Sequence, residues 1–196
     1  MARRPVDAAA ERKRLLDAIE ALILKHGSAK ASVSDAAAMC GMSQSNAYRF
    51  FPSKAALMAA VADRWFEKVE TAVGVVADGP GPGIVKLRAM IVAQYAIKRA
   101  QLDADEALFA AYLNLAAANP EAPRGHVTRL RAAMLNLVKA AFTEGHFTAR
   151  PPGRTAALIE AATVAVRDPW QIRDRRRDWT LKDTQALVDA VLSGLD

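Results

Sequence analysis

Apolar side chains recur every three or four positions along most of the chain, which is the spacing of one face of an α-helix. Over residues 9–26 this face is formed by Leu15, Leu16, Ile19, Leu22 and Ile23. Gly27 follows as a stop signal, because glycine readily takes the left-handed conformation that ends helices. No segment shows the strict alternation of apolar and polar residues that is typical of a β-strand. The pattern therefore predicts an all-α protein.

Capping residues predict three further helices, at about residues 33–40, 44–50 and 54–77. Ser32 followed by Asp35 fits the capping box, in which a hydroxyl and an acid bond to free backbone N–H groups at a helix start. Gly41 supplies the backbone freedom of a tight turn. Ser43 and Ser53 are suited to cap the second and third of these helices.

Five more helical segments are predicted at about residues 84–101, 104–118, 123–144, 153–167 and 181–193. The segment DGPGPG, residues 78–83, is the clearest internal break, because glycine and proline do not continue a helix. Further breaks are expected at Asn119-Pro120, at Gly145, over residues 150–153 and around Asp168-Pro169.

Charge is distributed unevenly along the chain. The formal net charge is +6, from 27 Lys and Arg against 21 Asp and Glu. Residues 1–54 carry nine basic and five acidic side chains, a net charge of +4, so most of the excess lies in the first quarter of the chain. Such a balance is typical of a protein with an anionic partner, either nucleic acid or a membrane surface.

The cysteine count and the apolar runs indicate the compartment. Cys40 is the single cysteine, so no disulfide forms within the chain. The first residues, MARRPVDAAAERKR, lack the apolar core of a signal peptide, and no apolar run approaches the roughly 20 residues of a membrane span. We therefore expect a cytoplasmic protein with no membrane partner.

Two short helices joined by a glycine turn describe a helix-turn-helix, whose second helix enters the major groove of DNA. That second helix contains Gln44, Ser45, Asn46, Tyr48 and Arg49. Gln and Asn can form paired hydrogen bonds with adenine, while the long Tyr and Arg side chains reach phosphates or bases. Lys54 begins the next helix, where the helix dipole already favours a phosphate.

These residues carry a resemblance to a known family. The segments RLLDAIEALILKHG, residues 14–27, and SVSDAAAMCGMSQSNAYRFFPSKAALMAAV, residues 32–61, resemble the DNA-binding domain of the TetR family of bacterial repressors. The likeness covers roughly residues 12–61. Its most specific elements are the Gly-x-Ser turn, the Tyr-x-x-Phe end of the reading helix and the Ser-Lys-x-x-Leu start of the next, formed by Gly41, Ser43, Tyr48, Phe51, Ser53, Lys54 and Leu57.

The resemblance implies an all-α fold of about nine helices. A helix-turn-helix DNA-binding domain with a basic arm would occupy residues 1–53, and a helical effector-binding and dimerisation domain residues 54–196. The protein would be a homodimer, joined mainly by its last two helices, that represses a gene from a palindromic operator until a small molecule releases it. Carried over by position, the DNA contacts would be Ser34, Gln44, Ser45, Asn46, Tyr48 and Lys54, to which side-chain chemistry adds Arg49.

Aromatic and polar residues among the aliphatic ones of the C-terminal region form a candidate effector site. The candidates are Met90, Gln94, Tyr95, Phe109, Tyr112 and Leu113. Such a mixture is typical of an apolar pocket with a few polar groups, but ordinary core packing explains each residue equally well. Residues 154–167 and 181–195 are the candidate dimer helices, and covering the protein's own core is their alternative role.

The sequence gives little support for catalysis, cofactor binding or metal binding. No nucleophile and base arrangement, paired carboxylates or Gly-rich nucleotide fingerprint is present, so we expect no catalytic residues and no cofactor. His26, His126 and His146 lack ligand spacing, so no metal site is expected. Arg3 and Arg4 are either a DNA-contacting arm or a tail, and residues 173–177 are either a solvated connection or an anion site.

Two alternative functions remain open at the level of sequence. One is a helical ligand-binding protein or enzyme whose helix-turn-helix is structural. The other is a regulator without a small-molecule ligand.

Overall fold

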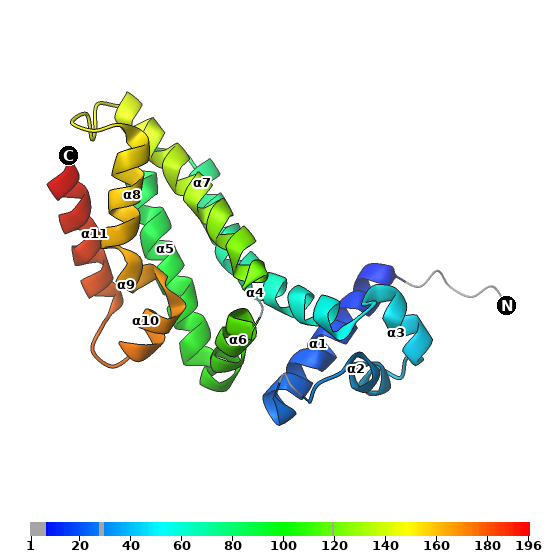
Figure 1. The fold of residues 1–196 in the computed structure, drawn as a ribbon. Coiled ribbons are helices and arrows are strands. Elements are labelled where there is room, and N and C mark those ends of the chain that lie inside the picture. The colour runs from blue at the N-terminus through cyan, green and yellow to red at the C-terminus, as the bar shows by residue number, and fades with distance from the viewer. Residues whose placement is uncertain (1–6, 28–29, 119) are drawn as a thin grey trace. The chain divides into compact units, whose positions relative to one another are not determined.

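The computed structural model describes residues 7–27, 30–118 and 120–196 (Figure 1). The described residues contain no strand and form eleven helices: α1 Ala8–His26, α2 Val33–Met39, α3 Gln44–Phe50, α4 Lys54–Asp78, α5 Gly83–Ala104, α6 Glu106–Ala118, α7 Glu121–Thr143, α8 Pro152–Ala162, α9 Val164–Arg167, α10 Pro169–Asp174 and α11 Leu181–Leu195. The all-α prediction is confirmed. Within this part of the chain, no helix is both long and apolar enough to cross a lipid bilayer.

Two helices beyond the expected nine lie within residues 163–174. The segment predicted as a single helix at 153–167 is divided at Thr163, whose buried hydroxyl donates to the carbonyl of Ile159 at 2.6 Å and accepts from Arg167 at 3.0 Å. The next short helix, α10, begins at Pro169 and is capped by Asp168, which accepts from the backbone N–H of Gln171 at 3.0 Å. Proline at the first helical position is compatible with this start.

Backbone contacts divide the chain into two compact units. One comprises residues 1–65 with 106–122, and the other comprises residues 66–105 with 123–196. Helix α4 contributes residues to both, and α6 groups with the N-terminal helices rather than with its sequence neighbours. The expected functional division, into a DNA-binding domain of residues 1–53 and an effector-binding and dimerisation domain of residues 54–196, stays a prediction.

In the first unit, α1 packs against α2 and α6. Its apolar face is buried as the sequence predicts, with Leu15, Ile19 and Ile23 at most 5% exposed. The contact with α6 adds a polar bond, because the Tyr112 hydroxyl donates to Glu20 at 2.8 Å. The long α1 thereby packs against both α2 and α6, while α3 packs against α2.

In the second unit, α5 lies alongside α9, α10 and α11 (Figure 1). Its first residue, Gly83, donates its backbone N–H to both carboxylate oxygens of Glu144, at 2.8 and 2.7 Å. A Cβ atom at this position would lie 2.5 Å from the backbone nitrogen of Ala141. The glycine at the end of the 78–83 break therefore permits a close approach of α5 to α7.

This close approach predicts the effect of one methyl group. Gly83→Ala should lower the free energy of unfolding by about 1–3 kcal/mol, since backbone atoms cannot yield as a flexible side chain would. Urea unfolding followed by circular dichroism measures the change. Gly153→Ala, on α8 with nothing within 4 Å of the added atom, is the matched control and should change stability by less than about 1 kcal/mol. Equal effects of the two variants would contradict the explanation.

Candidate nucleic-acid interface

The turn between α2 and α3 is set by a glycine in the left-handed conformation. Gly41 has φ +63°. The backbone N–H of Met42 donates to the carbonyl of Ala37 at 2.9 Å, and that of Gly41 to Ala38 at 3.1 Å. This pair of bonds is the Schellman motif that closes helices at glycine. It fixes the direction in which the chain enters α3.

Helix α3 is capped at its start and anchored at its end. The Ser43 hydroxyl accepts from the backbone N–H of Asn46 at 3.3 Å. Ala47 is fully buried, and Phe51, directly after the helix, is 2% exposed. The guanidinium of Arg12 on α1 lies 5.0 Å from the centre of the Phe51 ring, a cation–π contact. Small and aromatic anchors thus hold one face of α3 against the protein.

The other face of α3 is open to solvent. Gln44, Ser45, Tyr48 and Arg49 are exposed, and Asn46 is partly exposed. No side chain of these five has a hydrogen-bond partner within the described residues. The structure therefore gathers the predicted base-reading and phosphate-reaching residues on one small helix whose polar groups are available.

Two further predicted contact residues lie on neighbouring helices. Ser34, on α2, is partly exposed, and Lys54 is exposed as the first residue of α4. The predicted cap of α4 is present, because the Ser53 hydroxyl accepts from the backbone N–H of Ala56 at 3.1 Å. Contact of all seven residues with DNA stays a prediction. Arg3 and Arg4 lie outside the described residues.

The turn is also tied to α1 at Cys40. Its carbonyl accepts from Arg14 Nη2 at 2.7 Å, and its thiol donates to the carbonyl of Arg14 at 3.4 Å. Partial burial raises the pKa of the Cys40 thiol, with the nearby Arg14 charge opposing that rise. The cysteine is therefore a neutral thiol at pH 7 rather than a reactive thiolate.

The six predicted effector residues fall into the two different units. Met90, Gln94 and Tyr95 are buried on α5, while Phe109, Tyr112 and Leu113 are buried on α6. Within the first unit, the Trp65 ring stacks on Tyr112 at 5.4 Å and meets Phe109 edge-on at 5.7 Å. Burial and the bond to Glu20 raise the pKa of Tyr112. Phe109 and Tyr112 are therefore part of the core of the first unit.

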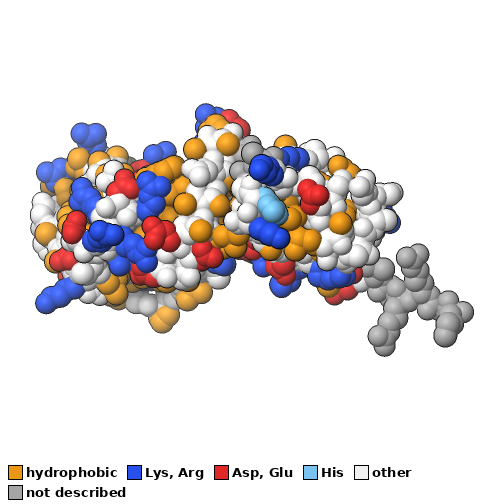
Figure 2. Space-filling model, turned by 90° about the horizontal axis from the view of Figure 1, so that it is seen from below, with side chains coloured by type: hydrophobic (Ala, Val, Ile, Leu, Met, Phe, Trp, Pro, Cys, Tyr) orange, Lys and Arg blue, Asp and Glu red, His pale blue; other side chains and the backbone are white. Residues whose placement is uncertain are grey.

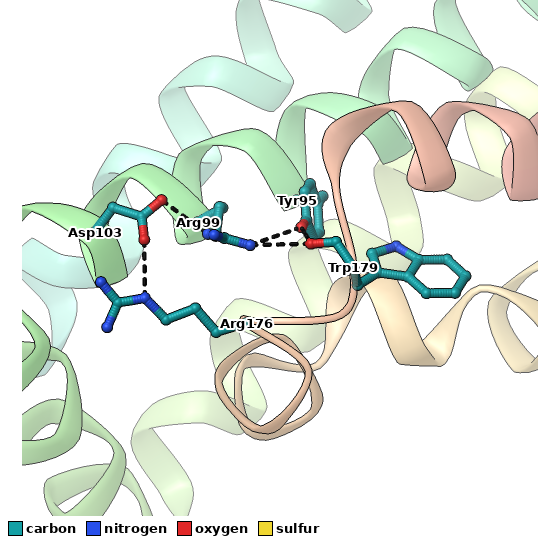
Figure 3. Close-up of polar contacts among 5 residues, drawn as sticks. All are labelled: Tyr95, Arg99, Asp103, Arg176 and Trp179. Atoms are coloured by element: carbon teal, nitrogen blue, oxygen red, sulfur yellow. Dashed lines mark hydrogen bonds and ion pairs between the residues drawn. The ribbon is translucent and has the colours of Figure 1, made fainter.

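Tyr95 holds the connection between α10 and α11 against α5 (Figure 3). Its hydroxyl donates to the carbonyl of Trp179 at 3.0 Å, and Arg99 donates to the same carbonyl at 3.0 Å. Asp103 accepts from Arg99 at 2.8 Å and from Arg176 at 3.0 Å. These contacts border a cavity of about 420 Å³ that Tyr95, Arg99 and Trp179 line.

The arginine-rich segment at residues 173–177 is thus only partly a solvated connection. Arg176 pairs with Asp103, and the guanidinium of Arg173 lies 4.7 Å from the centre of the Trp170 ring. Figure 2 shows Lys and Arg side chains gathered over the end of the second unit that carries α10. Sequence alone could not reveal the pairing of Arg176, because Asp103 lies 73 positions earlier.

A larger cleft of about 540 Å³ lies in the second unit between α4, α5 and α7. It contains the charged residues Glu70, Lys86 and Arg129, and none of the six predicted effector residues lines it. Glu70 is partly buried, and hydrogen bonds from Arg129 and His126 outweigh that burial and lower its pKa. The cleft is therefore a mixed polar and apolar hollow.

A buried lysine on α5 is not among the site residues that the sequence predicts. Lys98, on α5, is 4% exposed, and its ammonium donates to the carbonyl of Arg167 at 2.5 Å. Burial, aided by the charge of Arg167, lowers its pKa to about 7, although Asp168 opposes the change. The available signal was its spacing, since position 98 lies one helical turn after Gln94 in an otherwise apolar stripe.

Comparison with known proteins identifies both halves of the chain. Residues 15–61 match the family model described as bacterial regulatory proteins, tetR family, and residues 84–188 match the tetracyclin repressor-like C-terminal domain. No curated protein matches the chain.

Solved structures share the fold at low sequence identity. SmeT, the repressor of the Stenotrophomonas maltophilia multidrug efflux pump SmeDEF, is 19% identical over 93% of this chain and 89% of its own, with a TM-score of 0.71. Its complex with triclosan is 19% identical over 94% and 91%, with a TM-score of 0.70. A regulator of the TetR/AcrR family from Thermobifida fusca YX-ER1 is 18% identical over 95% and 99%, with a TM-score of 0.70.

The left-handed turn predicts how substitutions at Gly41 behave. Gly41→Ala should destabilise the protein by about 1–2 kcal/mol, because a Cβ atom is disfavoured at positive φ. Gly41→Asn should cost less, since asparagine tolerates this conformation. Urea unfolding of both variants measures the difference. Nothing lies within 4 Å of the added Cβ, so equal losses for both would indicate that backbone conformation is not the cause.

Proposed function

The chain belongs to the tetR family of bacterial regulatory proteins, and we propose that it is a homodimeric repressor that a small-molecule effector releases from a palindromic operator. It acts in the cytoplasm, where such an operator is accessible. The observation that carries the proposal is the exposed polar face of α3, mounted on a buried Ala47 and Phe51.

DNA reading follows from the residue types on that face. Gln44 and Asn46 can each make paired hydrogen bonds with adenine, and Ser45 suits several bases. Tyr48 and Arg49 extend the same face toward the sugar-phosphate backbone of DNA. Lys54, at the N-terminus of α4, places a positive charge where a phosphate is favoured. The seven predicted contacts, including Ser34, thus divide into base readers and phosphate binders.

Control by a small molecule is supported by the second unit. A relative with the same fold has been solved with triclosan bound, and the second unit of this chain holds two cavities, of about 540 and 420 Å³. Because α4 begins at Lys54 and continues into the second unit, a ligand that moves α4 would also move this DNA-contacting residue. Met90, Gln94 and Tyr95, on α5, remain candidates for effector contact.

Dimerisation is supported by small and apolar side chains that are exposed or partly exposed on α8 and α11. On α8, Ile159 is buried within the unit while Ala161 and Ala162 are exposed. On α11, Val188 and Leu192 are buried while Val191 stays partly exposed. Two helices with small outward residues can approach closely across a twofold axis, and a dimer doubles the number of base pairs read.

The two alternatives predict different behaviour toward DNA and ligands. A helical ligand-binding protein or enzyme with a structural helix-turn-helix would not prefer DNA from upstream of its own gene. A regulator without an effector would bind that DNA but would not be released by any metabolite. A gel shift with this DNA, repeated with a metabolite library, separates the three.

Substitution of one base reader and one phosphate binder tests the division of roles. Gln44→Ala should cost about 1–3 kcal/mol on the preferred operator and little on unrelated DNA. Lys54→Ala should weaken binding to all sequences alike. It should also lower by about one the number of counterions released on DNA binding, as measured by the slope of log affinity against log salt concentration. Fluorescence anisotropy at several salt concentrations measures both. Lys139→Ala, an exposed site on α7, controls for net charge, and equal shifts for Gln44→Ala and Lys54→Ala on all DNA would disprove the division.

The dimer is tested by placing charge on its proposed face. Light scattering should give twice the 21.1 kDa chain mass for the unmodified protein at micromolar concentration. Ala161→Glu should weaken association at least about tenfold, since two like charges then meet across the axis. Ala132→Glu on the exposed side of α7 should leave the dimer intact. A monomeric unmodified protein, or a fully dimeric Ala161→Glu, would contradict the proposal.

A further inference from the structure

Helix α5 carries a buried row of polar side chains. Gln94, Lys98 and Gln101 are spaced by four and three positions, so they lie on one side of the helix above one another. Met90, fully buried, lies one turn before Gln94 on the same side. A polar row inside an otherwise apolar packing layer requires partners for its hydrogen-bonding groups.

Most of those groups lack a partner. Gln94 is completely buried, and within the described residues neither its amide nitrogen nor its amide oxygen has a hydrogen bond. The amide atoms of Gln101 are buried and unpaired in the same part of the chain. Burying an amide without a hydrogen bond costs free energy that native structures rarely leave uncompensated. The row therefore has the chemistry of a site that another molecule completes.

Lys98 adds positive charge to this row. An ammonium group has three donors. Within the described residues its one hydrogen bond is to the carbonyl of Arg167, the last residue of α9, at 2.5 Å. Two donors therefore remain for a further acceptor. A lysine is seldom buried unless it is paired, and here no carboxylate of the described residues is bonded to it.

The charges around Lys98 favour an anion. On α9 and directly after it lie Arg167 and Asp168, which act on the Lys98 ammonium with opposite signs. On α7, His126 also interacts with Lys98, and its own pKa is lowered chiefly by burial. The nearest acid to that histidine, Glu70, is already engaged, accepting from Arg129 at 2.7 Å and lying 2.7 Å from His126 Nδ1. A ligand carboxylate would supply the negative charge that the row lacks.

We propose that the effector is an organic carboxylate whose head group accepts hydrogen bonds from Lys98 and the Gln94 amide, with its apolar body beside Met90. This proposal names the ligand class of the effector site and rests on the proposed function. The unpaired Gln94 oxygen can also accept from a hydroxyl or N–H group of the ligand. Charge-assisted bonds of this kind are about twice as strong as neutral ones.

The test compares carboxylates with their neutral amides. Benzoate, 1-naphthoate and octanoate, each beside its primary carboxamide, are added to the full chain without DNA. At least one carboxylate should raise the melting temperature with increasing concentration, and its carboxamide should bind about 10- to 100-fold more weakly. Failure of all three carboxylates to bind at millimolar concentration, or equal binding of acid and amide, would overturn the proposal.

Proton uptake gives a second and more specific measurement. Because the pKa of free Lys98 is about 7, its amine is largely neutral at pH 8.5 and must take up a proton to bind an anion. Calorimetry in buffers of different ionisation enthalpy should show about one proton taken up per bound carboxylate at pH 8.5 and almost none at pH 6. Absence of uptake at pH 8.5 would show that Lys98 is not the anchor.

Matched variants separate anchoring from folding. Lys98→Met should remove both the proton uptake and the preference for the acid. Lys139→Met is the control, because Lys139 is an exposed lysine on α7 that lines neither of the two cavities. Gln94→Leu should raise the melting temperature of the free protein yet weaken carboxylate binding about tenfold. A Gln94→Leu variant that binds unchanged, or a Lys139→Met variant that loses binding equally, would contradict the assignment.

These measurements need no operator, so they are independent of DNA release. A carboxylate that binds through Lys98 but does not displace the protein from DNA would leave the ligand class standing and disprove control by that ligand. Release of DNA by a neutral compound that ignores Lys98 would support effector control and overturn the carboxylate assignment.

Discussion

The burial of α5 is the constraint on which the second unit depends. A helix surrounded on several sides must place its polar groups where other elements can satisfy them. At its start, the backbone N–H of Gly83 donates to the carboxylate of Glu144, directly after α7, and Arg88 donates to both carboxylate oxygens of Asp189 on α11. Tyr95 and Lys98 donate to main-chain carbonyls of Trp179 and Arg167. Successive turns of one helix thereby determine where α7, α11, α9 and the 175–180 connection lie.

The same constraint explains why the unpaired groups on α5 are informative. The helix satisfies most of its charged and hydroxyl groups through partners on other elements, so the unsatisfied amides of Gln94 and Gln101 are exceptions. Exceptions of this kind concentrate at functional sites, because a site prepared for a ligand keeps its polar groups uncommitted until the ligand arrives.

The DNA-reading unit uses the opposite arrangement. Here the buried side of α3 is minimal, with Ala47 as its one buried residue, so nearly the whole helix is available to a partner. Its orientation is therefore set by neighbours in sequence, through the Gly41 turn and the Ser43 cap, and by the Phe51 anchor beneath Arg12. Local geometry controls a reading helix that has little packing of its own.

The sequence by itself determined most of the helices, the caps at Ser32, Ser43 and Ser53 and the turn at Gly41, because those depend on bonds between residues at most five positions apart. It also indicated the family and the polar residues of α3, because the motifs that carry them are short and continuous in sequence. It did not show the division at Thr163 or helix α10. The tertiary structure alone decided that α6 joins the N-terminal unit, that Gly83 is needed for close packing and that Lys98 lies buried beside Arg167. Those features depend on contacts between residues tens of positions apart, whose approach no local spacing encodes.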